Sequence, residues 1–174
     1  MSDSAQEFSS FVVASERRLL GIAYLLTGDR GHAEDLLQTA LAATYRRWAR
    51  VSTTENPMAY VRTAMVHTAI SWRRRRMSTE RVVDRFPDVP VEDAQTSSAA
   101  ADEMRRALMR LSPRVRAVLV LRFYADLTER ETARILGCSV SSVSTHTARG
   151  LAALRTSLSA GGEPPVPVPQ EGRS

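Results

Sequence analysis

Apolar residues in the first part of the chain recur at intervals of three and four, the period of an α-helix with one buried face. The first such stripe consists of Phe8, Phe11, Val12, Ser15, Leu19, Ile22, Ala23 and Leu26. The second stripe consists of Ala33, Leu36, Leu37, Ala40, Leu41, Thr44, Tyr45 and Trp48. Between them, Gly28 favours the turn that ends a helix and Asp29 suits the cap of the next one. The pattern therefore predicts two helices in succession.

The helical period breaks in the segment VSTTENP and returns after Pro57, a residue that favours the first turn of a helix. This third helix is predicted to run to about Arg76, and three helices with short connections form a small bundle over residues 6–76. Residues 77–101 contain two prolines, several acids and the run TSSAAA, with no periodicity. They are predicted to form a flexible linker.

Helices are predicted to return at Asp102 and to form a second domain over residues 102–158. Ser112 and Pro113 are a cap and a first-turn proline, and they open a helix that extends to about Tyr124. A last helix is predicted from about Val140 to Leu158. Residues 159–174 are rich in Pro and Gly and are expected to be a disordered, solvated end. The predicted fold is all-α, with two small helical domains joined by the linker.

The second domain carries the spacing of a helix-turn-helix. Thr128 and Glu131 match a capping box, in which each side chain bonds the other residue's backbone. Small Ala133 suits a close helix crossing, Gly137 suits a turn with positive φ, and Val143 is placed to fill the core between the two helices. Few helical hairpins combine all of these features, so the spacing favours a DNA-binding motif.

The last helix is polar on the face that would read a DNA groove. Its apolar face consists of Val140, Val143, Thr147, Leu151, Leu154 and Leu158, and the opposite side carries Ser142, Thr145 and Arg149, flanked by Ser141 and His146. Hydroxyl groups can contact bases or phosphates, and Arg149 can contact guanine or phosphate. The same residues also suit an ordinary solvated face, and this stretch alone leaves both interpretations open.

All 24 basic residues are arginines, and the net charge is +5. Guanidinium groups pair well with phosphate, although the codon bias of a GC-rich genome explains the same composition. Cys138 is the single cysteine, which excludes an intrachain disulfide and a cysteine metal cluster, and the three histidines show no ligand spacing. The chain also shows no nucleophile–base pairing and no phosphate loop. We expect no metal, no cofactor and no enzymatic activity.

The start of the chain, MSDSAQEF, is polar and acidic, so no signal peptide is expected. No apolar run approaches the roughly 18 residues that a membrane helix needs. A cytoplasmic protein without a membrane partner is predicted.

Three segments together resemble bacterial sigma factors of the extracytoplasmic-function type, a group of the sigma-70 family, with most likeness to the actinobacterial SigE-like branch. They are GHAEDLLQTALAATYRRW, NPMAYVRTAMVHTAISWRRRR and LSPRVRAVLVLRFYADLTERETARILGCSVSSVSTHTARGLAALR. The resemblance covers about residues 8–157. It implies regions 2 and 4 of a sigma factor that binds core RNA polymerase and directs it to promoter DNA. It also implies contacts with the polymerase β subunit and the β′ clamp helices, a possible anti-sigma factor, and association with the nucleoid as part of the holoenzyme.

The resemblance also implies roles for particular residues. Docking on the β′ clamp helices would involve Asp35, Leu36, Gln38, Leu41 and Tyr45. Opening and reading the −10 element would involve Tyr60, His67, Ser71, Trp72, Arg73, Arg74, Arg75 and Arg76. Reading the −35 element would involve Ser141, Ser142, Ser144, Thr145, His146 and Arg149. The linker would thread the polymerase's active-site and RNA-exit channels.

These roles are physically reasonable but have alternatives. Arg73–Arg76 offer charge to DNA phosphates and Tyr60 and Trp72 offer rings for base stacking, while cations at a helix end and a core tryptophan explain the same residues. Likewise, Asp35 also suits the first turn of a helix.

The chain departs from the family pattern at several predicted DNA contacts. His67 stands where the family usually has Asn, Ser71 where it often has Asp, and Ser144 and His146 at usually basic positions. Whether His67 contacts a base or only fills the helix is left open by the sequence, as is the promoter sequence. Two other hypotheses are a stand-alone helix-turn-helix regulator and a protein-interaction module such as an anti-sigma decoy. The first of these gives no role to the N-terminal bundle with its arginine run and docking helix, whereas the second is favoured slightly by the scarcity of charge on the reading helix.

Overall fold

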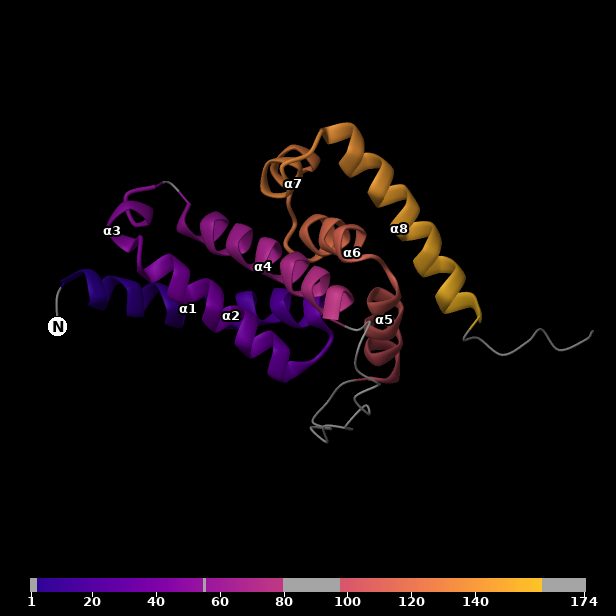
Figure 1. Ribbon diagram of the computed structural model, residues 1–174, viewed down its shortest axis with the longest axis horizontal. Coiled ribbons are helices and arrows are strands. Elements are labelled where there is room, and N and C mark those ends of the chain that lie inside the picture. Colours follow the sequence, from indigo (N-terminus) through magenta and orange to yellow (C-terminus); the bar gives the residue numbers. More distant parts are fainter. Residues whose placement is uncertain (1–2, 55, 80–97, 161–174) are drawn as a thin grey trace, which may run out of the picture.

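The computed structural model describes residues 3–54, 56–79 and 98–160, and every regular element in these ranges is a helix. The N-terminal half contains α1 (Asp3–Thr27), α2 (Arg30–Tyr45), α3 (Trp48–Val51) and α4 (Pro57–Thr79). The C-terminal half contains α5 (Ala99–Arg110), α6 (Pro113–Leu119), the π-helix η1 (Val120–Tyr124), α7 (Glu129–Leu136) and α8 (Val140–Ala160) (Figure 1). The predicted all-α fold is confirmed.

Capping residues define the helices of the N-terminal half. Gly28 has a positive φ of 76° and its amide donates to Tyr24 O at 2.7 Å, which ends α1. The Asp29 carboxylate accepts from the His32 amide at 2.8 Å and so caps α2, as predicted. The Asn56 side chain accepts from the Ala59 amide at 3.0 Å at the start of α4. These short connections bring α1, α2 and α4 together as a small bundle.

The second helix ends earlier than its apolar stripe suggests. α2 ends at Tyr45, and Trp48 instead begins the short helix α3. The indole remains in the core, because Trp48 is only 5% exposed and its ring lies 5.0 Å from that of Phe8 and 5.3 Å from that of Phe11. The apolar pattern thus predicted the burial of Trp48 correctly but placed it in the wrong helix.

The C-terminal half has the predicted helix-turn-helix. The capping box between Thr128 and Glu131 is formed at the start of α7, and Gly137 ends α7 with a left-handed φ of 62°. Ala133 and Val143 are buried between α7 and α8. Upstream, Ser112 caps α6 through the Val115 amide, and the predicted single helix widens into the π-helix η1 after Leu119.

The helices extend into both ends of the predicted linker. α4 continues through residues 77–79, and α5 already begins at Ala99. At the other end of the chain, α8 includes residues 159 and 160, which were predicted to be disordered. The remainder of the predicted linker and of the predicted disordered end lies outside the described residues.

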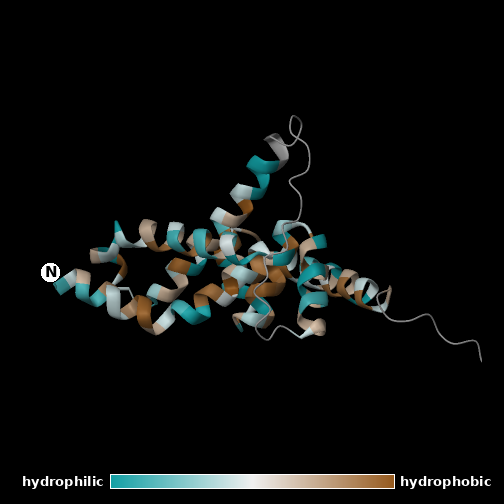
Figure 2. Cartoon of the chain, turned by 90° about the horizontal axis from the view of Figure 1, so that it is seen from below, coloured by the Kyte–Doolittle hydropathy of each residue, from teal (hydrophilic) through white to brown (hydrophobic). Residues whose placement is uncertain are grey.

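The two halves pack against each other through one apolar core. This core joins Leu19, Ile22, Leu36 and Met65 of the N-terminal bundle to residues of the C-terminal half, namely Ala117, Val118, Val120, Leu121, Ala125, Ala133, Ile135, Leu136 and Val143. α4 contacts both α6 and α7, and α1 contacts α5, α6 and η1. Apolar residues gather in the middle of the molecule, where the halves meet (Figure 2). The sequence predicted the two domains but not this close packing.

Candidate functional site

The residues predicted to dock on polymerase lie along α2, but they do not all reach its surface. Asp35, Gln38 and Tyr45 are exposed, and Leu41 is half-buried beside them. Leu36 is 0% exposed and belongs to the bundle core, so its side chain is not available to a partner. Gln38, Leu41 and Tyr45 follow Asp35 by three, six and ten positions, which places all four along one helical face. This polar face with one aromatic residue is suited to contacting another helix.

The arginine run at the end of α4 is exposed throughout, from Arg73 to Arg76. Arg76 donates to Nε2 of His32 at 2.6 Å, and Nδ1 of the same ring lies 3.0 Å from the Asp29 carboxylate. Because a guanidinium has only donors, Nε2 of His32 accepts, and a neutral ring then carries its proton on Nδ1. Because all four arginines are exposed, the run presents several cations at one end of α4, and such a group is suited to binding a polyanion.

The two aromatic residues predicted for the −10 element are both half-buried. The Tyr60 hydroxyl accepts from Arg47 at 3.3 Å, near the start of α4. Trp72 packs against the shared core from further along the helix. Since about half of the 23-residue helix α4 separates them, the structure does not bring these two rings together.

His67, Ser71 and Arg74 lie on the part of α4 that faces the C-terminal half. Together with Arg114 and Leu136 they line a groove between the halves. His67 Nε2 donates to Ile135 O at 2.7 Å, since a carbonyl oxygen only accepts. His67 therefore bonds the backbone of α7 in this structure, which neither of the two alternatives left open by the sequence had anticipated.

The predicted reading face of α8 is largely exposed. Ser141, Ser144, Thr145 and Arg149 are exposed, while Ser142 and His146 are half-buried. Ser139 caps the helix by accepting from the Ser142 amide at 3.0 Å. It also bonds the Ser142 hydroxyl at 2.9 Å.

Two details of α8 depart from the predicted pattern. Nδ1 of His146 is enclosed and has no hydrogen-bond partner among the residues that the structure describes, so an outside partner could not reach this nitrogen. Val140, assigned to the apolar face, is 43% exposed. The predicted apolar and polar faces of α8 thus agree best with the observed burial in its middle turns.

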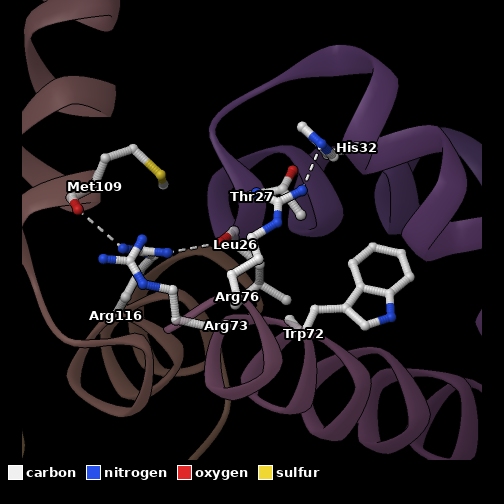
Figure 3. Close-up of a pocket in the computed structure, with 9 residues that line it drawn as sticks. Leu26, Thr27, His32, Trp72, Arg73, Arg76, Met109 and Arg116 are labelled. Carbon is white, nitrogen blue, oxygen red and sulfur yellow. Dashed lines mark hydrogen bonds between the residues drawn. The ribbon is translucent and has the colours of Figure 1, made fainter. Parts of the chain in front are cut away.

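A buried arginine that the sequence analysis did not single out lies where the halves meet. Arg116 of α6 is 5% exposed and donates to four carbonyl oxygens, those of Leu108, Met109, Leu111 and, across the boundary, Leu26 at 2.9 Å. Burial, with a smaller effect of nearby Arg73, lowers the pKa of Arg116 to about 10. The group stays charged at neutral pH, and the four acceptors compensate its loss of water. Figure 3 shows Arg116 between Met109 and Leu26.

Within the described ranges, no group of three or more His, Cys, Asp or Glu side chains is arranged to hold a metal ion. No helix found there has the length and apolar character needed to cross a membrane.

Comparison with known proteins identifies both halves. Residues 11–79 match the family model "Sigma-70 region 2", and residues 101–154 match "Sigma-70, region 4". The RNA polymerase sigma-E factor of Streptomyces coelicolor is 37% identical over 152 residues, which cover 87% of this chain and 86% of the relative. The chain belongs to the sigma-70 family. It is an alternative sigma factor of the extracytoplasmic-function, SigE-like kind, and it directs transcription initiation.

Further relatives and solved structures agree with this sigma factor in sequence and fold. The sigma-E factor of Streptomyces avermitilis is 36% identical over 87% of this chain and 85% of the relative. A sigma factor RpoE of Bartonella quintana, solved with the anti-sigma factor NepR, superposes with a TM-score of 0.74 at 22% identity, covering 88% of this chain and 98% of the other. CnrH, solved with the cytosolic domain of CnrY, gives a TM-score of 0.63 at 18% identity and covers 91% of each chain.

The residues at the boundary between regions 2 and 4 of the sigma factor were not found from the sequence. A signal existed for Arg116, which is a lone charge within the apolar run VRAVLVL. A signal also existed for Gly21 at the same boundary and for Gly150 inside region 4, because glycine destabilises the interior of a helix. A Cβ atom at Gly150 would lie 2.8 Å from Leu119 Cδ1, so this glycine lets α8 approach α6 closely.

Proposed function

We propose that region 4 reads the −35 element through the exposed face of α8, and that α4 of region 2 binds and helps to melt the −10 element. The observation that carries this proposal is the helix-turn-helix, which leaves Ser141, Ser144, Thr145 and Arg149 exposed on its second helix. Hydroxyl groups and a guanidinium are groups that read base edges or position a helix on phosphates. His146 can add only Nε2, because its Nδ1 is enclosed, and Ser142 adds a hydroxyl already bonded to Ser139.

A reading helix with so little charge does not need to anchor the protein by itself. The exposed arginines of α4 supply phosphate contacts. Docking on core RNA polymerase holds region 4 near the duplex and raises its effective concentration there. Under these conditions, a few polar contacts are enough to select among sequences.

We propose that docking on the β′ clamp helices uses Asp35, Gln38, Leu41 and Tyr45, with further contacts to the β subunit. The accessible face of α2 supports this proposal. Leu36 contributes from the core, by holding α2 in the bundle.

An anti-sigma factor is a proposed partner, because the similar RpoE of Bartonella quintana was solved with one. The relatives are sigma factors, which are not enzymes, and we propose that this protein likewise catalyses no reaction and needs no cofactor. Since a bacterial sigma factor works where its polymerase is, we place it in the cytoplasm, on the nucleoid when it is part of the holoenzyme.

Run-off transcription with purified core polymerase tests the proposal. The sigma factor is expected to yield transcripts from particular promoters, while the protein without polymerase binds duplex DNA weakly. Arg149→Ala should reduce transcription from promoters that depend on the −35 element by roughly five-fold or more, the usual effect of losing one base contact. Arg155→Ala removes an exposed arginine from another face of α8 and serves as the control.

Equal transcription by Arg149→Ala and the unmodified protein would remove Arg149 from the reading face. A sequence-specific footprint at nanomolar protein without polymerase would instead favour the stand-alone regulator.

A further inference from the structure

Arginines from both regions meet around one small cavity. Its lining includes Arg73 and Arg76 of α4 and Arg116 of α6, with His32 of α2 beside them. None of the described residues that line the cavity is acidic. Figure 3 shows these side chains around the same space. A hollow lined by charges of one sign concentrates their field, so this cavity attracts anions.

Two of these cations lie close enough to repel each other. Burial and, to a smaller extent, the charge of Arg73 lower the pKa of Arg116 to about 10. Arginine remains charged at neutral pH, so the structure holds two like charges together with no carboxylate among the described lining residues. An anion placed between the two guanidinium groups would be attracted by both and would offset their repulsion.

The guanidinium groups at the cavity have N–H donors that are not in use. A guanidinium has five N–H groups, and Arg116 donates four of them to the backbone carbonyl groups described above. One N–H on its Nη1 is therefore left without an acceptor among the described residues, although the side chain is only 5% exposed. Arg73 forms no hydrogen bond or ion pair with the described part of the chain. These donors are available to a ligand.

The cavity has the size of a small oxyanion. Its volume is about 70 Å³. Such a volume holds on the order of five water molecules, which matches the number of non-hydrogen atoms in a phosphate ion. Leu26, Ala69 and Met109 supply apolar parts of its wall. An ion held there is partly removed from water, where its attraction to the arginines is stronger.

The arrangement of the donors favours phosphate over a carboxylate. Arg73 and Arg76 come from α4, whereas Arg116 comes from α6 on the other side of the cavity. A phosphate group offers oxygens in several directions and pairs well with guanidinium groups, whereas a carboxylate has two oxygens in one plane. Trp72 is half-buried and also lines the cavity, so its ring offers a surface on which a nucleotide base could stack.

We propose that this cavity binds a small phosphate-bearing anion, held by Arg73 and Arg76 from region 2 and by the remaining N–H of Arg116 from region 4. The site goes beyond the DNA contacts proposed for the arginine run, because a cavity of this size admits one phosphate group and not a DNA strand. Inorganic phosphate and the phosphate of a mononucleotide share this chemistry, and the experiment below separates them.

Isothermal titration calorimetry of the full-length protein tests the site. Sodium phosphate, adenosine monophosphate and sodium acetate are titrated separately, at one ionic strength set with sodium chloride. Phosphate is expected to bind, and acetate to give only the heat of dilution. Equal affinities for phosphate and the nucleotide would assign the site to free phosphate, whereas tighter binding of the nucleotide would assign it to a phosphate with a base stacked on Trp72.

Two variants separate an enclosed site from general attraction by charge. Arg73→Ala should weaken phosphate binding about ten-fold or more, the effect of losing one hydrogen bond between charged groups. Arg74→Ala removes the same charge from the next residue, which lines a different groove, and should have little effect because salt screens its charge. Ala69→Leu changes no charge but fills the cavity, so it should abolish binding.

The proposal is overturned if phosphate and acetate give the same titration. Equal weakening by Arg73→Ala and Arg74→Ala would also overturn it, because net charge alone would then attract phosphate. The same holds if Ala69→Leu binds phosphate as tightly as the unmodified protein. Circular dichroism and urea unfolding of each variant establish that it is folded before it is titrated.

Discussion

Gly137 makes the turn of the helix-turn-helix possible through its backbone alone. Its φ is +62°, and apart from its chain neighbours no atom of the described residues lies within 4 Å of where a Cβ would stand. Gly137→Ala should therefore lower the free energy of unfolding by about 1 kcal/mol, the cost of a left-handed conformation for an L-residue, as measured by urea denaturation. Gly137→Asn should cost less, because asparagine tolerates this conformation. Equal stability of the alanine variant would mean that the turn relaxes.

Glu131 makes the stability of the same motif depend on pH. Its carboxylate accepts from the Thr128 amide at 2.7 Å and from the Thr128 hydroxyl at 2.8 Å, and these bonds, with smaller effects of Arg134 and Arg62, lower the pKa of Glu131. A carboxyl whose pKa is lower in the folded state stabilises the fold above the usual glutamate range and loses that effect as the pH falls through its folded pKa.

Glu131→Gln is therefore expected to destabilise the protein at neutral pH and to have little effect in strong acid. Denaturant unfolding over a pH series measures this difference. A constant difference between the two proteins at every pH would show that the charge of Glu131 is not responsible.

The exposed face of α2 carries the prediction at the level of an element. Asp35→Ala combined with Leu41→Ala should weaken binding to core polymerase, because it removes a charge and an apolar contact from one face while the buried Leu36 keeps the helix in place. Thr39→Ala, at another exposed position of α2, is the control. Co-purification with tagged β′ measures the effect, and unchanged recovery of the double variant would remove α2 from the docking surface.

Local signals in the sequence predicted most elements, because caps and periodicity depend on nearby residues. Asp29, Ser112 and the Thr128 capping box each start a helix as predicted. The break after Tyr45 was missed because the apolar stripe continues through it. Trp48 is buried in α3, just as the pattern predicted for a continuous second helix. The π-helix η1 was also missed, because a wider turn adds one residue to the ring of backbone bonds without changing the apolar character of its sequence.

Packing between the two regions was not predictable from the same signals. The exposure of His67, Ser71 and Arg74 on a free helix suits DNA and a neighbouring domain equally, so their polarity does not separate the two. The better indications were residues out of place in their own helix, such as Arg116 in an apolar run and Gly21 in a helix interior. Each satisfies a contact with the other region, which periodicity within one helix does not reveal.

One shared core implies that the whole molecule unfolds as a unit. Both tryptophans, Trp48 and Trp72, are in region 2, so their fluorescence reports on that region, whereas circular dichroism reports on the helices of both. The two signals should follow a single transition in urea. Leu121→Ala in region 4, at a fully buried position of the shared core, should lower the free energy of unfolding by about 2–5 kcal/mol in both signals. Arg155→Ala, on the surface, should leave the free energy of unfolding unchanged in both signals. Separate transitions, or a fluorescence midpoint that Leu121→Ala does not change, would show that the regions fold independently and that their contact contributes little to stability.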